Sequence, residues 1–206
     1  MLSYSLPGQS GKLGKRRETT MIPNRTQARA LWDKYQIPES KRRHLELVAD
    51  VAEVMADALE TKGIEVEKNL LLAGALLHDI DKNVQRLPGE QHPDTAVRIL
   101  NQEGMEEVSR LVKTHSLHSI LTDDIAPHTW EEKLLFLADK MVKYDVITVD
   151  ERFRLWKNEG LPQEGREIIQ RTYPKVKKLE KEILDLTDMT SRDIARVVKT
   201  GKKSTI

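Results

Sequence analysis

Hydrophobic positions between residues 26 and 199 recur with the spacing of α-helices almost throughout. The run from 66 to 78 is apolar nearly all round, which is typical of a central, fully buried helix. It is shorter than the roughly 20 residues that span a bilayer. In the segment before it, the residues at offsets 0, 4, 7 and 11 share one helix face: His44, Val48, Val51 and Met55.

Start and stop signals divide this stretch into successive helices. We expect Ser40 to cap a helix that Gly63 ends, and Pro93 to be the first residue of a helix that runs to Asn101. Thr129 and Glu132 have the spacing of a capping box. The other expected helices cover about 26–35, 106–117, 129–144 and 164–186, the last bent at Pro174, and a short helix starts at Ser191.

The chain of 206 residues suits one sizeable domain. We find no strand pair, internal repeat or glycine-rich phosphate loop in the sequence, so the predicted fold is all-α with a single domain over residues 23–199. Residues 1–22 are rich in glycine, serine and basic residues and are expected to be a disordered tail, with a weak electrostatic contact arm as the alternative. Residues 200–206 form a second expected tail.

Composition narrows the function classes. Lys and Arg number 34 against 33 Asp and Glu, and the net charge of +1 predicts neither nucleic-acid nor membrane binding. The absence of cysteine excludes disulfides, thiolate metal sites and a thiol nucleophile. No secretory signal or membrane-length apolar run is evident, so a cytoplasmic location is expected.

Several histidines and aspartates fall at the ends or on the apolar faces of the expected helices. Taken singly, such a histidine is more often an ordinary core residue, and an aspartate can cap a helix. Taken together, imidazoles and carboxylates that separate helices deliver to one core need a compensating charge, which one or two divalent metal ions would supply. The residues concerned are His44, His78, Asp79, His92, His115 and Asp139.

The order of these residues resembles that of the HD-domain metal-dependent phosphohydrolase superfamily, over about residues 40–155, and implies an HD-type helical fold with the metal site in its core. The segments that carry the resemblance are His44, Leu71-Leu72-Ala73-Gly74-Ala75-Leu76-Leu77-His78-Asp79-Ile80-Asp81-Lys82, His92-Pro93, Lys113-Thr114-His115 and Leu137-Ala138-Asp139-Lys140. Residues 160–199 would then be a C-terminal helical extension.

The resemblance implies one metal ion held by His44, His78, Asp79 and Asp139. A second would be held by His92 and His115 with Asp79 bridging, as in the two-metal branches. Lys82 matches a lysine that faces the substrate phosphate, and Asp79 and Lys82 are the implied catalytic residues. Asp81 departs from the usual Gly or Ala, and an extra carboxylate there could repel or reposition a phosphate.

The implied activity is hydrolysis of a phosphomonoester or phosphoanhydride by a hydroxide that the metal activates, with a nucleotide as the expected substrate. Histidine and carboxylate ligands suit Mn, Fe, Co or Zn better than Mg. The expected partner is therefore a small phosphate-containing molecule. Two alternatives stay open, namely a di-iron oxygenase on the same ligand set, and a non-catalytic nucleotide sensor that uses the charged helix 164–186 as its partner surface.

Four further polar residues lie near the motifs. His118 would share a helix face with His115 if that helix continued, which makes it a substrate contact or a bystander. His128 precedes the Thr129 cap and is expected at the surface. Arg152 and Arg154 follow the Asp139 helix and are expected to be solvated, with contact to the substrate as the alternative.

Overall fold

A computed structural model describes residues 20–201, and these residues form an all-α fold. The two expected tails therefore fall largely outside the described residues. Within the described range, the β structure is a single isolated bridge between Val142 and Val146. The helices are α1 (Arg25–Lys34), α2 (Glu39–Thr61), α3 (Lys68–Leu77), α4 (Asp94–Gln102), α5 (Glu106–Lys113), α6 (Trp130–Lys140), α7 (Val149–Lys157), α8 (Gln163–Thr187) and α9 (Ser191–Gly201), with short 3₁₀ helices η1 (Leu117–Leu121) and η2 (Asp123–Ile125).

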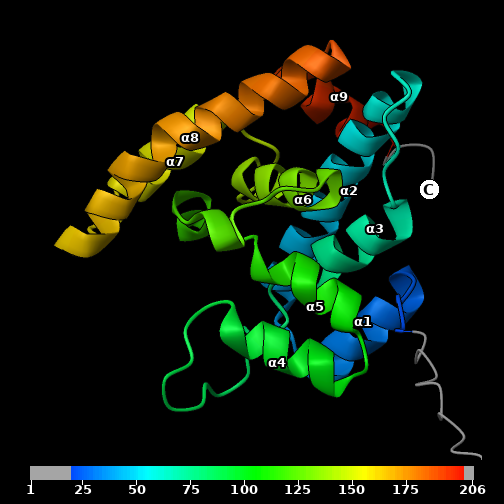
Figure 1. Ribbon diagram of the computed structural model, residues 1–206, viewed down its shortest axis with the longest axis vertical. Helices are drawn as coiled ribbons and strands as arrows, with labels where there is room; N and C mark the ends of the chain where they lie inside the picture. The colour runs from blue at the N-terminus through cyan, green and yellow to red at the C-terminus, as the bar shows by residue number, and fades with distance from the viewer. Residues whose placement is uncertain (1–19, 202–206) are drawn as a thin grey trace, which may run out of the picture.

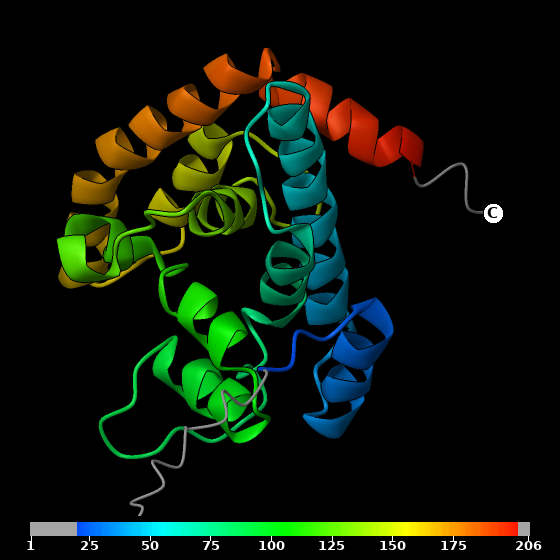
Figure 2. The same cartoon turned by 45° about the vertical axis from the view of Figure 1, so that its right-hand side comes forward.

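Helices α2 and α3 form the centre of the molecule. Helix α2 packs against α3, α6, α8 and α9, while α3 also contacts α1, α5 and α6. Helices α4 and α5 pack against each other on the α1 side of the molecule, and α8 lies across the other side with α7 beside it (Figures 1 and 2). This arrangement brings α2, α3, α5 and α6 around one interior region, where the candidate site lies.

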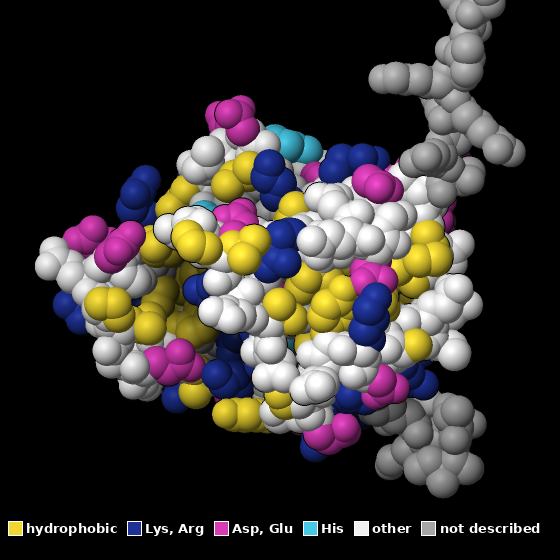
Figure 3. Space-filling model, turned by 90° about the horizontal axis from the view of Figure 1, so that it is seen from below, with side chains coloured by type: hydrophobic (Ala, Val, Ile, Leu, Met, Phe, Trp, Pro, Cys, Tyr) yellow, Lys and Arg dark blue, Asp and Glu magenta, His cyan; other side chains and the backbone are white. Residues whose placement is uncertain are grey.

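The two central helices are buried as their patterns predict. Helix α3 buries six of its residues because apolar side chains cover most of its circumference. Gly74 in its middle permits close contact with α5, since a Cβ atom there would lie 2.4 Å from Leu111 Cδ2. Within residues 20–201, no helix is long and apolar enough to cross a membrane. On the face shown in Figure 3, basic and acidic side chains are interspersed.

Two expected helix starts are displaced, by two residues at α2 and by one residue at α4. Helix α2 begins at Glu39, with Pro38 as the N-cap in an extended conformation, so Ser40 lies inside the first turn and caps nothing. Helix α4 begins at Asp94, and Pro93 is its N-cap rather than its first helical residue. The capping box of Thr129 and Glu132 at the start of α6 is confirmed.

Two helices end earlier than expected. Helix α5 ends at Lys113 instead of reaching Leu117, because Thr114 turns its hydroxyl back to the carbonyl of Leu111 and the chain then enters η1. Helix α6 ends at Lys140 instead of Tyr144, where the chain makes the tight turn closed by the Val142–Val146 bridge.

Helix α7 was not expected, although its start carries a recognisable signal. The hydroxyl of Thr148 accepts a hydrogen bond from the backbone N–H of Glu151, the same Thr-x-x-Glu spacing as at α6. Helix α8 includes Pro174 within a continuous helix, which is curved in both views (Figures 1 and 2).

Candidate metal centre

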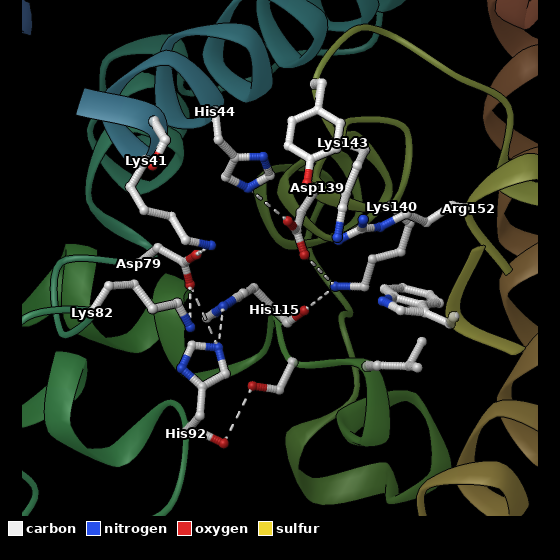
Figure 4. A pocket seen from close by; sticks show the side chains of 15 residues that line it. Lys41, His44, Asp79, Lys82, His92, His115, Asp139, Lys140, Lys143 and Arg152 are labelled. Atoms are coloured by element: carbon white, nitrogen blue, oxygen red, sulfur yellow. Dashed lines mark hydrogen bonds and ion pairs between the residues drawn. The ribbon is translucent and has the colours of Figure 1, made fainter. Parts of the chain in front are cut away.

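The six predicted ligands come from five places in the chain and meet in one cluster. Figure 4 labels five of them, namely His44, Asp79, His92, His115 and Asp139. Each lies where a local element ends or where a buried helix face points inward. His44 is on α2, His78 is the C-cap of α3 with Asp79 next to it, His92 precedes α4, His115 follows α5, and Asp139 is in the last turn of α6. A side chain at the end of a helix can reach the cluster because no further helical turn covers it.

The first group consists of His44, His78 and Asp79, whose ligand atoms all lie within 4.8 Å of one another. Asp139 adjoins this group: its Oδ1 atom is 3.2 Å from His44 Nε2 and 3.5 Å from His78 Nε2. All four residues are buried or nearly so. Two nitrogen and two oxygen donors converge here, a set suited to a divalent metal ion.

The second group consists of Asp79, His92 and His115 and shares its carboxylate with the first. Asp79 Oδ1 lies 3.7 Å from His92 Nε2, and His92 Nε2 lies 3.0 Å from His115 Nε2. The histidine rings form a chain of edge-to-face contacts from His44 through His78 and His115 to His92. The structure thus brings all six predicted ligands together, with Asp79 between the two groups.

The hydrogen bonds of three histidines leave one nitrogen of each facing the cluster. In His78, Nδ1 lies 2.9 Å from the carbonyl oxygen of Ala75. In His115, Nδ1 lies 2.5 Å from the carbonyl oxygen of Val112. A carbonyl only accepts, so we assign the ring proton of both histidines to Nδ1. In His92, Nδ1 lies 3.2 Å from Asp81 Oδ2, and the proton is assigned to Nδ1 there as well. Nε2 then carries a lone pair.

Those lone pairs have no partner that would satisfy them. His78 Nε2 is buried without a hydrogen bond. With the Nδ1 protons assigned as above, the close approach of His92 Nε2 and His115 Nε2 sets two lone pairs against each other unless a proton or a metal ion lies between them. Buried polar atoms in proteins almost always have partners. The donors present therefore fit a bound divalent cation.

Burial and neighbouring charges shift the pKa values in the cluster. Burial alone would raise the pKa of Asp79, but the positive charge of Lys82 beside it helps to hold that pKa well below the usual range. The pKa of Asp139 is likewise low despite burial, because Lys140 and the hydrogen bond from His44 favour the carboxylate. Burial, together with the positive charge of Lys140, holds the pKa of His115 well below its usual value, so this imidazole stays neutral and able to bind metal.

Asp81 supports a ligand and does not face the cavity. Its side chain is 2% exposed, and Oδ2 lies 3.2 Å from His92 Nδ1. A carboxylate in this position fixes the proton on Nδ1 and turns Nε2 toward the cluster. The expectation that this carboxylate could repel a phosphate has no support here, because the side chain points into the protein.

Lysines surround the two ligand carboxylates. Lys82 Nζ is 3.0 Å and Lys41 Nζ 3.6 Å from an oxygen of Asp79. Lys140 is almost fully buried, and its Nζ lies 2.7 Å from Asp139 Oδ2 and 2.5 Å from the carbonyl oxygen of His115. All three lysines line the cavity of about 480 Å³ that adjoins the cluster.

Of the four other candidate residues, three are exposed outside the cavity and one lines it. His118 lies on η1, exposed and away from the lining of the cavity, because α5 ends before it and the shared helix face is lost. His128 is exposed, with Nε2 2.8 Å from the carbonyl oxygen of Asp123. Arg154 is exposed on α7 beside Glu151, whereas Arg152 lines the cavity.

Three of the cavity lysines were given no role from the sequence, namely Lys41, Lys140 and Lys143. Lys140 stands directly after the predicted ligand Asp139 in an apolar segment, and a lysine in such a segment is a signal for a buried ion pair. Lys41 and Lys143 carry no comparable signal, because isolated lysines near helix ends are common on protein surfaces.

Comparison with protein families matches residues 42–193 to the family described as HD domain. A tRNA (cytidine(56)-2'-O)-methyltransferase from Picrophilus torridus is 27% identical over 206 aligned residues, which cover 94% of this chain and 54% of the relative. An uncharacterised protein from Methanocaldococcus jannaschii is 29% identical over 137 residues, 58% of this chain and 80% of the relative. The chain thus spans about half the length of the first relative. No solved structure matches it.

Proposed function

The chain belongs to the HD-domain metal-dependent phosphohydrolase superfamily, and from this premise we propose that it hydrolyses a phosphomonoester or phosphoanhydride bond, with a nucleotide as the substrate. The observation that carries the proposal is the pair of ligand groups that share Asp79 and leave histidine nitrogens without partners. The Picrophilus relative is named for a reaction on a tRNA cytidine, which is a second reason to test nucleotides first.

In the proposed site, His44, His78, Asp79 and Asp139 would hold one divalent metal ion, and His92 and His115 would hold a second with Asp79. A bound metal pair supplies Lewis acidity and lowers the pKa of water, so that hydroxide is available near neutral pH. The donor set of imidazoles and carboxylates favours Mn, Fe, Co or Zn over Mg.

The protein's own groups would bind and orient the phosphate. Lys82 lines the cavity beside Asp79, where its ammonium group can neutralise charge on the non-bridging oxygens of the phosphate. Lys41 lies beside the other oxygen of the Asp79 carboxylate, and its ammonium group can likewise neutralise charge on the phosphate. Asp81 keeps His92 in one orientation through the bond to Nδ1.

The charge of the cavity favours a phosphate ligand and so argues against the oxygenase alternative. Five cationic side chains line it, against two carboxylates that are both proposed metal ligands. Oxygen activation has no need of such a lining, whereas a multiply charged phosphate does. The cavity cations are Lys41, Lys82, Lys140, Lys143 and Arg152.

The test is release of inorganic phosphate from a panel of nucleotides by the purified full chain, with Mn, Fe, Co, Zn or Mg added after removal of bound metal. We expect release that depends on added metal and is abolished by His78→Ala and by Asp79→Ala. The matched control is His128→Ala, an exposed histidine outside the cluster that should keep wild-type activity.

Retained activity in either cluster variant, or activity that persists with a chelator, would overturn the proposal. Thermal melting of each variant separates loss of the site from loss of the fold. Oxygen consumption in the iron-loaded protein without phosphate release would favour the oxygenase alternative, and tight nucleotide binding without turnover would favour the sensor.

A further inference from the structure

Arg152 lies on α7 and lines the same cavity as the metal cluster, yet it has no acceptor for its charge (Figure 4). Its Nε and Nη1 atoms are buried without a hydrogen bond. Among the described residues, no carboxylate forms an ion pair with this guanidinium. Arg152 as a residue is partly exposed, but two buried N–H donors without an acceptor are disfavoured, so a binding role explains Arg152 better than a structural one.

The other cations of the cavity already have acceptors. Lys41 and Lys82 lie beside Asp79, and Lys140 beside Asp139. Lys143 Nζ is 3.1 Å from Glu159 Oε1. Within the described lining of the cavity, Arg152 therefore stands apart as the cation whose hydrogen-bond donors remain free.

The guanidinium also lies over an aromatic ring, which restrains its position. Its central carbon lies 4.5 Å from the centre of the Trp156 ring, and Trp156 is itself in edge-to-face contact with Phe153. Stacking on an indole holds the plane of the guanidinium while leaving its N–H groups free to donate. A planar fork of this kind matches the two oxygens of a phosphate or a carboxylate.

Arg152 lies away from the lysines that accompany Asp79. In Figure 4, Lys41 and Lys82 lie on one side of the histidines and Arg152 on the opposite side, next to Lys140 and Lys143. One cavity of about 480 Å³ includes both sides, and cavities of this order bind small organic molecules rather than a single ion.

We infer that Arg152, stacked on Trp156, binds a second anionic group of the substrate while the phosphate to be cleaved lies at the histidine–aspartate cluster. The substrate class is thus a phosphate ester or anhydride with a further phosphate or a carboxylate. This inference rests on the proposed function for the place of the first phosphate. The anion site at Arg152 itself rests only on the contacts above.

The first test needs no activity. Inorganic pyrophosphate is titrated into the metal-free full chain, with binding followed by calorimetry and by the fluorescence of Trp156, which Trp156→Phe identifies. We expect wild-type protein to bind and Arg152→Gln to bind at least roughly tenfold more weakly, as for a lost charge-assisted hydrogen bond. Arg154→Gln, two residues along the same helix and exposed, should bind like wild type.

Equal binding by wild type and Arg152→Gln, or no binding by wild type at millimolar pyrophosphate, would overturn the inference. Weaker binding by Arg154→Gln to the same degree would also overturn it, because the effect would then be one of general surface charge. Thermal melting of all variants shows whether the fold is retained.

The second test uses the metal-loaded protein and three matched substrates: phenyl phosphate, 4-carboxyphenyl phosphate and 1,4-phenylene bisphosphate. We expect wild type to prefer one or both of the substrates with a second anionic group over phenyl phosphate. The preferred substrate shows whether that second group is a carboxylate or a phosphate. Arg152→Gln should reduce that preference, measured as a ratio of kcat/KM values, by roughly tenfold through KM.

An unchanged ratio in Arg152→Gln would overturn the inference. If wild type cleaves none of the three substrates and no nucleotide, the proposed function fails instead, and the pyrophosphate titration still decides whether Arg152 is an anion site.

Discussion

Replacing Lys140 by methionine removes a buried positive charge that the metal centre depends on for its shape. Lys140 is 1% exposed, and its Nζ holds Asp139 Oδ2 and the carbonyl oxygen of His115. The other oxygen of Asp139 is thereby left facing His44. Methionine has nearly the length of lysine, so Lys140→Met tests the charge and the hydrogen bonds rather than the packing.

The expected loss of stability is large because both partners are buried. Breaking a buried ion pair by removing one member costs about 3–5 kcal/mol. In a protein of this size each kcal/mol lowers the melting temperature by about 2–4 °C, so the metal-free variant should melt roughly 6–20 °C below wild type. Burial lowers the pKa of Lys140 itself, so we expect a fall in melting temperature toward the lower part of that range.

The assay is thermal and urea unfolding of the metal-free protein at neutral pH, followed by circular dichroism. Lys143→Met is the matched control, because Lys143 lines the same cavity but pairs with the exposed Glu159, and the loss should be at most about 1 kcal/mol. The double variant Lys140→Met/Asp139→Asn should regain part of the stability, since no unpaired buried charge remains. A melting temperature for Lys140→Met as close to wild type as that of the control would refute the reasoning.

Three further predictions concern positioning, packing and pH. Asp81→Ala should weaken manganese binding about 10–100-fold in calorimetry while the fold is kept, because the histidine that Asp81 orients loses its partner; unchanged affinity would contradict this. Gly74→Ala should destabilise the protein by about 1–3 kcal/mol in urea unfolding, since the new Cβ meets Leu111 and this outweighs the gain of about 1 kcal/mol in helix propensity; a more stable variant would show that Leu111 moves freely. Burial, and the hydrogen bond to Glu103, raise the pKa of Tyr35 to about 12. The stability that Tyr35 contributes below its unfolded pKa of about 10 should therefore be lost as the pH rises from about 10 to 12. An absorbance titration of wild type minus that of Tyr35→Phe measures the pKa of Tyr35, and a midpoint near 10 would disprove the prediction.

The sequence was most informative where one kind of residue recurs on one helix face. The apolar run before His78 predicted a buried helix, and α3 is such a helix. The order of histidines and aspartates also led to the cluster, because these residues rarely fall on apolar faces without a common partner.

Tertiary contacts decided what the sequence left open. The early end of α5 removed His118 from the face of His115, and no residue pattern signals that end because it depends on a hydroxyl that turns back to its own helix. Asp81 and Arg152 are similar cases. The sequence shows a carboxylate and an arginine, but only the packing shows that the first holds His92 and that the second points into the cavity.

Two ligand groups joined by Asp79 are proposed to bind divalent metal, and the proposed hydrolysis depends on this binding. The most direct test is the manganese content per chain, measured by elemental analysis after loading and dialysis, for wild type, Asp79→Asn and His92→Ala. We expect two ions in wild type, one for each group, a fall toward one in His92→Ala, and loss of both in Asp79→Asn. Manganese content in Asp79→Asn equal to that of wild type would contradict it.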